Sequence, residues 1–549
     1  MATQRIIAVL SLVLLVGVAP PPERGKGLVA ADHPLASQAG RKALLAGGNA
    51  VDAAVAAALA AGVVQPSASG LGGGGFAMIR VDRGSPRFVD FREVAPASVD
   101  AEAYRDDRAN PREGGAAVAV PSESRGLYWL ISQYGVLSPA EVVAPAVKLA
   151  RDGFPAGAFL VEQLGKTKLV SVSALWGRPQ TGDLVVNRAL ATTLARWAST
   201  RGEDLHTGAG ARAVVAAVAA AGGSLSAADL ATVQPKERDP TRFVWKGRTV
   251  FTAPPPSSGG LVVGVALRAV EAVNLAELGQ GSSAATHAVT EAFKHVYADR
   301  ARYLGDPDFV DVPLAQLLSD ERIAEVMRRF DPRQTLPLDT YGVPLASPVD
   351  HGTQHISVID VNGGAVALTS TVNTAFGSGV VVTSLGLLLN NQMDDFSMAP
   401  GRPNAYGLLG SEANALVGGK RPLSSMSPTL VLDGAENVEI AIGASGGAQI
   451  PSSVVVVLHN LVEFGLDAQE AVAAPRFHHQ WMPNRLVVEP GFPEDVRAAL
   501  VDRGHEVVVA DLYSCVQVVR RTADGELEAG ADPRKGGWPA GVVSLDVRR

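Results

Sequence analysis

Residues 350–371 constrain the fold of this 549-residue chain more than any other stretch. They contain two apolar runs joined by Asn362-Gly363, and this dipeptide between apolar runs is a strong signal for a β-hairpin. With Asn362 and Gly363 at the centre of the turn, Thr353 falls opposite Val372 and beside Thr371. A shift of one residue places Thr353 and Thr371 directly opposite each other. In either register we expect the two threonine hydroxyls to lie close together.

Two neighbouring threonines can support acyl-transfer chemistry. A threonine hydroxyl is a weak nucleophile until a base takes its proton, and a threonine at a chain terminus can use its own α-amine as that base. The amine of Thr353 becomes free only when the chain is cut before it. Gly352 permits an unusual backbone conformation in which the hydroxyl attacks the preceding carbonyl. Because threonine is also common in ordinary sheets, the pair alone does not decide between the two interpretations.

The remaining pattern predicts an α+β or layered α/β protein with stacked helical and sheet layers. Gly27–Ala31 is expected to be a strand, followed over residues 34–61 by two helices that Gly47-Gly48 separates. Asn49 is the expected N-cap of the second helix. Helical patterns dominate residues 118–345 and are clearest over 146–150 and 286–303. Further strands are expected at residues 76–81, 355–360, 365–371, 379–383, 385–389 and 429–432.

Several features argue against nucleotide, nucleic-acid and metal binding. The glycine run at 70–75 follows a helix and enters a strand, whereas a phosphate-binding loop follows a strand and opens a helix. A formal charge of −7 and a pI near 5.9 supply no basic field for a phosphate backbone. The single cysteine, Cys515, excludes a disulfide framework and is expected to be a small buried side chain. His478 and His479 are adjacent and cannot share a helix face, so we expect structural hydrogen bonds there, no metal and no cofactor.

The N-terminus has the layout of an export signal. Arg5 precedes an apolar run from Ile6 to Ala19, and a proline-rich segment follows. This run is shorter than the roughly 20 apolar residues that a membrane-spanning helix requires. We therefore expect residues 1–24 to be a signal peptide and the protein to be periplasmic or secreted.

Longer motifs occur throughout the chain, at His33–Ser37, Gly47–Ala54, Gly72–Phe76, Asp90–Glu93, Pro254–Gly260, Ala298–Tyr303, Leu389–Ser397, Pro422–Thr429 and Ala474–Trp481. Together they resemble the γ-glutamyltransferase (γ-glutamyl transpeptidase) family of N-terminal-nucleophile hydrolases. The resemblance extends over nearly all of the chain after the signal segment. It implies a four-layer αββα fold in which both products of a self-cleaved precursor form one unit.

The resemblance assigns the cut to the bond between Gly352 and Thr353. A large subunit of residues 25–352 and a small catalytic subunit of residues 353–549 are then expected to form a heterodimer. Thr353 corresponds to the nucleophile and Thr371 to the second threonine that hydrogen-bonds it. The backbone N–H groups of Gly446 and Gly447 correspond to the oxyanion hole. The implied activity is glutathione hydrolysis, or transfer of the γ-glutamyl group to an amino acid or dipeptide.

A γ-glutamyl donor such as glutathione carries a free α-amine and a free α-carboxylate, so its site needs an anionic and a cationic partner several ångströms apart. The resemblance implies that Arg92 binds the carboxylate together with Ser424 and Ser425. Asp395 receives the ammonium group together with Asn373 and Gln392. Tyr406 corresponds to a lid over the pocket that excludes water.

Gln354 departs from the family pattern, which has a second threonine directly after the nucleophile. Its side chain is expected to affect either self-cleavage or acceptor binding. Two other interpretations stay open. One is a sister activity on the same fold, such as a glutaryl or cephalosporin side-chain acylase or a polyglutamate-capsule transferase. The other is an unprocessed binding or scaffold protein.

Overall fold

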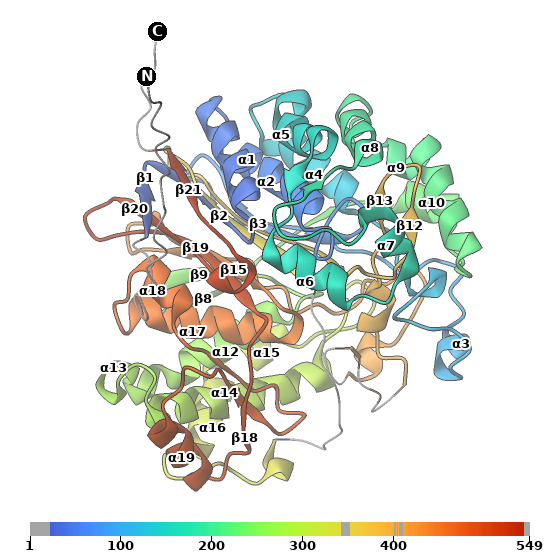
Figure 1. Cartoon of the computed structure of the whole chain (residues 1–549). Coiled ribbons are helices and arrows are strands. Elements are labelled where there is room, and N and C mark those ends of the chain that lie inside the picture. Colours follow the sequence, from blue (N-terminus) through green and yellow to red (C-terminus); the bar gives the residue numbers. More distant parts are fainter. Residues whose placement is uncertain (1–21, 342–351, 400–401, 403, 406–409, 543–549) are drawn as a thin grey trace, which may run out of the picture.

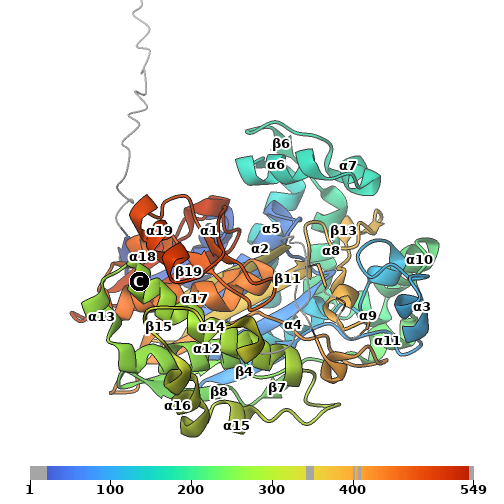
Figure 2. The ribbon, with the colours of Figure 1, turned by 90° about the horizontal axis from the view of Figure 1, so that it is seen from below.

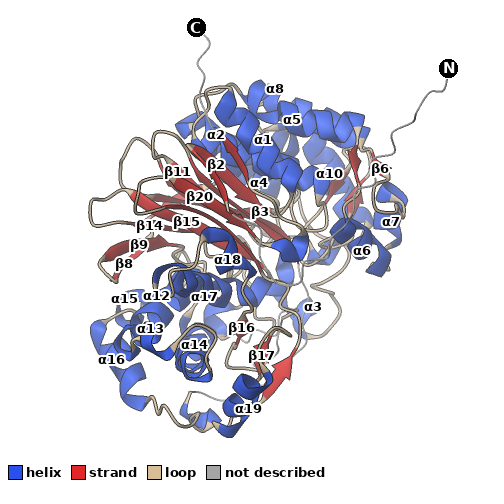
Figure 3. Cartoon of the chain, turned by 60° about the vertical axis from the view of Figure 1, so that its left-hand side comes forward, coloured by secondary structure: helices blue, strands red, loops and turns tan. Residues whose placement is uncertain are grey.

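Two seven-stranded antiparallel sheets face each other at the centre of the molecule (Figures 1 and 3). The structure is a computed structural model that describes residues 22–341, 352–399, 402, 404–405 and 410–542. The order of the first sheet is β21 (Ala540–Val542), β2 (Gly27–Ala31), β10 (Gly352–Ile359), β11 (Ala365–Asn373), β3 (Gly74–Arg80), β4 (Arg87–Phe91) and β7 (Lys236–Arg238). The order of the second is β1 (Glu23–Gly25), β20 (Leu527–Ala531), β19 (Cys515–Arg521), β15 (Val438–Ser445), β14 (Thr429–Leu432), β9 (Arg248–Thr252) and β8 (Thr241–Trp245).

Helices cover the outer face of each sheet (Figure 3). The first sheet is covered by α1 (Pro34–Leu45), α2 (Ala50–Val64), α4 (Glu123–Tyr134), α5 (Pro139–Asp152) and α8 (Arg188–Ser199). The second is covered by α12 (Gly259–Ala269), α14 (Ser283–Tyr303), α17 (Ile450–Val462) and α18 (Ala468–Ala473). This arrangement confirms the predicted αββα fold.

Smaller elements surround these four layers. The helices are α3 (Ala101–Arg105), α6 (Ala158–Lys166), α7 (Val170–Trp176), α9 (Asp204–Thr207), α10 (Ala209–Ala220), α11 (Ala227–Thr232), α13 (Leu275–Leu278), α15 (Leu314–Leu317), α16 (Asp320–Arg329) and α19 (Glu494–Asp502). The short strands are β5 (Phe154–Pro155), β6 (Leu184–Val185), β12 (Val381–Val382), β13 (Leu387–Leu388), β16 (Phe477–His478), β17 (Leu486–Val488) and β18 (Val507–Val509). Figure 2 shows α6 and α7 standing apart from the main body; we call residues 154–185 the flap.

Strand β3 shows why the central strands read as continuous apolar runs. Phe76 and Met78 belong to the core shared with the second sheet, whereas Ala77 and Ile79 belong to the core beneath α1 and α2. Because successive side chains in a strand point to opposite faces, a strand between two layers buries all of them. Asn49 caps α2 through its side chain and with Asp52 forms a capping box, as predicted.

The hairpin of β10 and β11 forms with the second of the two predicted registers. Thr353 pairs with Thr371 and Ile359 with Ala365. The turn is not a two-residue turn centred on Asn362-Gly363, because the amide of Gly363 donates to the carbonyl of Asp360. The Asp360 carboxylate accepts further bonds from the amides of Asn362 and Gly364, and Gly363 takes a left-handed φ of +83°. This longer turn shifts the strands by one residue and sets the two threonines opposite each other.

The glycine run before β3 serves close packing. A side chain at Gly73 would lie 2.0 Å from the carbonyl oxygen of Thr371. Only glycine lets the two backbones approach at this point. The run therefore helps to position β11 and Thr371.

Among the described residues, no helix combines the length and the apolar character required to cross a bilayer. The predicted signal peptide, residues 1–24, lies almost entirely outside the described part of the chain.

Candidate active site

Thr353 lies near the start of β10 and is 3% exposed. Its Oγ1 is 3.1 Å from Oγ1 of Thr371. The Thr371 hydroxyl donates to the carbonyl oxygen of Gly352 at 2.7 Å and accepts from the amide of Asn373 at 2.8 Å. Since the single proton of Thr371 is directed at Gly352, the Thr353 hydroxyl is the donor between the two threonines. Thr371 therefore binds both the hydroxyl of Thr353 and the carbonyl just before it.

Gly446 and Gly447 follow β15 and turn the backbone beside Thr353. Both take left-handed φ values, +120° and +56°. A side chain at Gly446 would lie 2.5 Å from the Cα of Ser514, so this backbone also requires glycine for space. Gly447 lines the same pocket as Thr353. The predicted oxyanion-hole pair thus lies next to the predicted nucleophile.

One narrow pocket brings together most of the predicted site residues. It is lined by Arg92, Thr353, Thr371, Asn373, Gln392, Asp395, Ser424, Ser425 and Gly447, with Leu423, Met426 and Ile450 as apolar wall. Gly352 and Gly446 do not line the pocket themselves, but they directly precede the lining residues Thr353 and Gly447 in the chain. Tyr406, the predicted lid residue, lies outside the described residues.

The two charged residues of this pocket contact each other. Nη2 of Arg92 lies 2.5 Å from Oδ2 of Asp395, where we expected their charges to lie several ångströms apart. Arg92 is 1% exposed and also donates to the carbonyl of Pro422. Opposite charges in a dry pocket neutralise each other when no ligand separates them. The pocket therefore holds these two side chains as a closed ion pair, not as two separate charges.

Burial also shifts the titration of the acidic groups around Arg92. The pKa of Asp395 is raised to about 6, chiefly because burial disfavours its charged form, while Arg92 opposes the shift. Glu93, whose carboxylate lies 3.7 Å from Nη1 of Arg92, has its pKa raised to about 7 for the same reason. Glu93 was part of a recognised motif but not among the predicted site residues.

The side-chain amide of Gln392 supports a ligand-binding role for the pocket. Both its oxygen and its nitrogen are buried without a hydrogen-bond partner, although Gln392 lines the pocket. Buried amides normally have partners, so this one marks a position where a polar ligand group fits. Ser424 lines the same pocket, and Ser258 of the Pro254–Gly260 motif holds it by donating to its carbonyl oxygen at 2.9 Å.

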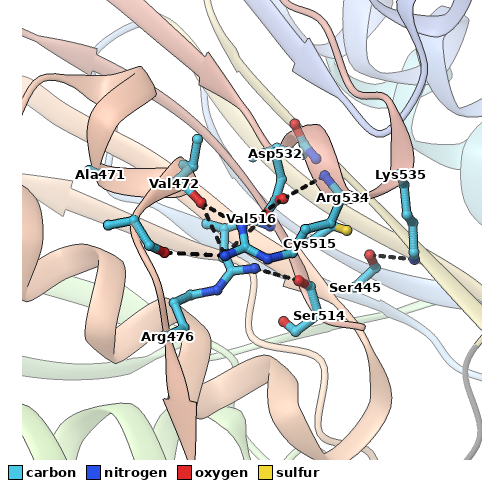
Figure 4. Close-up of polar contacts among 12 residues, drawn as sticks. Ser445, Ala471, Val472, Arg476, Ser514, Cys515, Val516, Asp532, Arg534 and Lys535 are labelled. Atoms are coloured by element: carbon cyan, nitrogen blue, oxygen red, sulfur yellow. Dashed lines mark hydrogen bonds and ion pairs between the residues drawn. The ribbon is translucent and has the colours of Figure 1, made fainter. Parts of the chain in front are cut away.

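Sequence reasoning missed a buried network behind Thr353 that Figure 4 shows in part. The ammonium group of Lys535 donates to the carbonyl oxygen of Thr353 at 3.0 Å and to the hydroxyl of Ser445 at 2.7 Å. Asp32 accepts from Ser445 at 2.9 Å and lies 3.5 Å from Lys535. Lys535 stands 182 positions after Thr353, and no local pattern signals such a contact.

Arg476 supports the backbone against which Gly446 packs. It is fully buried, pairs with Asp532 at 2.7 Å and donates to the carbonyl of Ser514 at 2.6 Å (Figure 4). Ser514 is the residue against which Gly446 packs. Arg476 belongs to a recognised motif, but its role in the site was not predicted.

Gln354, the departure from the family pattern, points away from the pocket. Its amide nitrogen donates to Oε1 of Gln65, at the end of α2, at 2.9 Å. It is fully buried beneath the helices that cover the first sheet. Through this contact Gln354 joins β10 to α2 and does not line the pocket of Thr353.

Three other side chains are buried structural residues. His478 bonds to Ser452 and Gln480, and the ring of His479 accepts from the amide of Trp481. These contacts confirm the predicted structural hydrogen bonding. Cys515 is a buried free thiol, as predicted, and burial raises its pKa well above the usual value.

His287, Glu291 and His505 form a cluster whose ligand atoms lie close enough to hold a metal. Nε2 of His287 donates to the carbonyl oxygen of Asp331, so its Nδ1 is the acceptor of the ring. This Nδ1 accepts a hydrogen bond from Nε2 of His505 at 2.7 Å. Nδ1 of His505 is then the acceptor that faces the ammonium of Lys294 at 3.5 Å. This chain of donors and acceptors satisfies both rings without an ion, and a cation would lie beside Lys294.

The fold and the site define the class of protein. Two facing antiparallel sheets between helical layers, with a buried threonine at the start of a central strand beside a second threonine and a glycine pair, characterise an N-terminal-nucleophile hydrolase. Comparisons with known proteins then give the family, because the model of the gamma-glutamyltranspeptidase family matches residues 36–542. The chain belongs to this family of enzymes.

Individual relatives agree with this placement. The glutathione hydrolase proenzyme of Escherichia coli is 39% identical over 531 residues, which cover 93% of this chain and 91% of that protein. A solved cephalosporin acylase from Bacillus halodurans is 28% identical, with a TM-score of 0.86 over 98% of this chain and all of that chain. The gamma-glutamyltranspeptidase of Helicobacter pylori is 33% identical, with a TM-score of 0.56, and covers 58% of this chain and 95% of its own.

Proposed function

We propose that the chain is the precursor of a glutathione hydrolase and γ-glutamyltransferase that cuts itself between Gly352 and Thr353. The observation that carries the proposal is the placement of Thr371, which binds both the hydroxyl of Thr353 and the carbonyl of Gly352. The charged pocket of Arg92 and Asp395 beside Thr353 supports a γ-glutamyl substrate.

Self-cleavage begins when Oγ1 of Thr353 attacks the carbonyl carbon of Gly352. Negative charge develops on the oxygen to which Thr371 already donates, so the hydroxyl stabilises it without rearrangement. The C–N bond breaks, the nitrogen of Thr353 takes the proton, and an ester remains. Water opens this ester and leaves a carboxylate on Gly352 and a free α-amine on Thr353. The products are subunits of residues 25–352 and 353–549, which stay together as a heterodimer.

In the mature enzyme the α-amine of Thr353 takes the proton of its own hydroxyl. The oxygen then attacks the γ-carbonyl of the donor, and the amides of Gly446 and Gly447 stabilise the oxyanion. The C–N bond of the donor breaks, and the leaving amine receives the proton. Water resolves the γ-glutamyl ester to glutamate, or an amino acid or dipeptide amine resolves it to a new γ-glutamyl amide.

The donor's α-carboxylate binds to Arg92 with the hydroxyls of Ser424 and Ser425, and its ammonium group binds to Asp395. Asn373 and Gln392 complete the ammonium side. The unpartnered amide of Gln392 supports this assignment, since a bound glutamyl head group would supply its missing partner. Tyr406 is proposed as the lid because of the family resemblance alone.

Substitution of Thr371 tests the role of its hydroxyl in self-cleavage. Thr371→Val keeps the shape of the side chain but removes the donor to Gly352, so we expect cleavage about 100-fold slower. Thr371→Ser keeps the hydroxyl and should retain most of the rate. Densitometry of the precursor band on denaturing gels over time measures both. Equal cleavage rates for the Val and Ser variants would exclude this role.

The similarity to a cephalosporin acylase favours one rival, an acylase of the same fold that accepts acyl groups without an α-amine. Steady-state hydrolysis of γ-glutamyl and glutaryl p-nitroanilides separates the two. The charges of Arg92 and Asp395 predict a kcat/KM at least about 100-fold higher for the γ-glutamyl compound. The glutaryl group keeps the carboxylate for Arg92 but has no ammonium group for Asp395, so the Asp395 carboxylate is left without its ligand partner. A preference for the glutaryl anilide would establish the acylase instead.

The apolar segment from Ile6 to Ala19 is proposed to direct export, so that the enzyme acts in the periplasm or outside the cell. Residues 1–24 are then removed as the signal peptide.

A further inference from the structure

Asp90 lies two residues before Arg92, and the proposed function gives it no role. It is fully buried near the end of β4. Its Oδ1 accepts hydrogen bonds from the backbone amide of Arg92 at 2.9 Å and from Nε of Arg421 at 3.1 Å. Its Oδ2 accepts a bond from Nε of Arg238 at 2.7 Å. Both oxygens of this carboxylate are therefore bound by donors, which come from three separate segments of the chain.

The charges around Asp90 balance one another. Arg421 is 4% exposed, and its backbone amide donates to Oδ2 of Asp306 at 2.8 Å. Asp306 is also buried and lies 3.8 Å from Nη2 of Arg238. Two carboxylates thus face two guanidinium groups, and we call Asp90, Arg238, Asp306 and Arg421 the Asp90 network. Such a network holds its geometry, because separating one buried pair leaves a charge without a partner.

Two contacts join the segment of Arg92 to the segment that leads to Ser424. One is the bond from Arg421 to Asp90. The other runs in the opposite direction, from Nε of Arg92 to the carbonyl oxygen of Pro422, at 3.3 Å. The chain continues from Pro422 to Ser424, which lines the same pocket as Arg92. The distance between the Arg92 guanidinium group and the serine therefore depends on these two contacts.

The Asp90 network is separate from the nucleophile. Thr353 is bound by Thr371 and by Lys535. Within the part of the chain that the structure describes, no hydrogen bond or ion pair joins the network to any of these three residues. A change in the network is therefore expected to act on the binding of the donor and to leave self-cleavage unaffected.

We propose that Asp90 is a positioning residue for the donor's α-carboxylate, because it fixes the Arg92 guanidinium group relative to the hydroxyls of Ser424 and Ser425. The inference rests on the proposed function, in which these three side chains bind that carboxylate. Asp90 does not touch the substrate itself. A guanidinium group and two hydroxyls bind one carboxylate together only when their spacing is exact, and Arg421 transmits this constraint from Asp90 to the serine segment.

Asp90→Asn tests the proposal. The amide keeps the shape of the side chain and an oxygen for the Arg92 amide, but it removes the charge that binds Arg421. We expect the KM for γ-glutamyl p-nitroanilide to rise about tenfold. The carboxylate is remote from the reacting carbonyl, so kcat and the half-time of self-cleavage should each change less than about twofold. The KM for the glutaryl compound should rise by a similar factor, because it carries the same carboxylate.

Asp308→Asn is the matched control. Asp308 binds Arg238 from the outer side at 2.8 Å, and among the described residues it is not bonded to Asp90 or Arg421. This variant removes an equal charge from the same arginine but leaves the link to the serine segment intact. It should behave as wild type. An equal rise in KM for both variants would show that any charge lost beside Arg238 suffices, and would overturn the specific role of Asp90.

Arg421→Lys tests the other side of the contact and decides the question alone if Asp90→Asn does not fold. Lysine keeps the positive charge but lacks the planar group that reaches both Asp90 and the carbonyl of Gln234. The KM for γ-glutamyl p-nitroanilide should rise about fivefold. Combined with Asp90→Asn, it should add little to the rise that Asp90→Asn causes, since both act through one contact.

Three results would contradict the account, and they are distinguishable. An unchanged KM in both single variants, with active wild-type protein, would exclude the positioning role. Slower self-cleavage, or a fall in kcat as large as the rise in KM, would show that the Asp90 network supports the whole fold and not the carboxylate subsite. Wild-type protein that is inert toward γ-glutamyl p-nitroanilide would instead refute the proposed function itself.

Discussion

Thr353→Ala is expected to remain one uncut chain and to lose at least about 1,000-fold of the wild-type kcat for γ-glutamyl p-nitroanilide. The substitution removes the only atom proposed to attack both the Gly352 carbonyl and the substrate. The residual rate would come from binding and the oxyanion hole alone. Denaturing electrophoresis reports the cleavage, and release of p-nitroaniline reports the turnover.

Thr353→Ser is the matched control because it keeps the hydroxyl while removing the methyl group. It should produce two subunits and a measurable rate. Full activity in an uncut Thr353→Ala protein would show that another residue is the nucleophile. Loss of cleavage in both variants, with unchanged thermal unfolding, would show that a hydroxyl at position 353 is not sufficient for self-cleavage.

Asp395→Asn is expected to lower kcat/KM for γ-glutamyl p-nitroanilide by at least about 100-fold and to change that for the glutaryl compound far less. The amide cannot neutralise the donor's ammonium group, and a lost charge-assisted contact in a dry pocket is costly. Because the variant also leaves Arg92 with one ionic partner fewer, thermal unfolding should be measured alongside. Equal losses for both substrates would mean that Asp395 supports the pocket without contacting the amine.

The same residue sets an acid limit on activity. Asp395 binds the ammonium only when ionised, and burial raises its pKa to about 6. Protonation of Asp395 should therefore add a fall in the wild-type kcat/KM for γ-glutamyl donors as pH decreases through about 6. Glu93, whose pKa is raised to about 7, also faces Arg92, as the Asp395 side chain does. Asp395→Asn distinguishes the contributions of these two carboxyl groups. In this variant the fall in kcat/KM near pH 6 should disappear, whereas any fall near pH 7 due to Glu93 should remain.

The hairpin of β10 and β11 shows which structural features the local sequence pattern could predict and which it could not. The two apolar runs and the Asn-Gly turn predicted the strands of Thr353 and Thr371, and the longer motifs predicted the four-layer fold. The register depended on the Asp360 side chain, which binds the turn amides and lengthens the loop by one pairing step. Apolar periodicity is compatible with a loop of either length, so it left both registers open.

Contacts between distant segments were the least accessible to sequence reasoning. The pairing of Arg92 with Asp395 joins residues 303 positions apart, and the network of Lys535, Asp32 and Ser445 joins three separate segments. The family resemblance indicated that Arg92 and Asp395 could bind a zwitterion, but not that the two side chains pair with each other. Gln354 was expected to affect cleavage or acceptors, and its contact with Gln65 became visible only once α2 was placed over β10.

Intact-mass and N-terminal sequence determination of purified, fully active protein tests the central claim most directly. The account predicts two polypeptides, one of which begins at Thr353 and ends at Arg549. Active material in which no polypeptide starts with Thr353 would contradict it, since the nucleophile would then have no terminal amine to accept its proton.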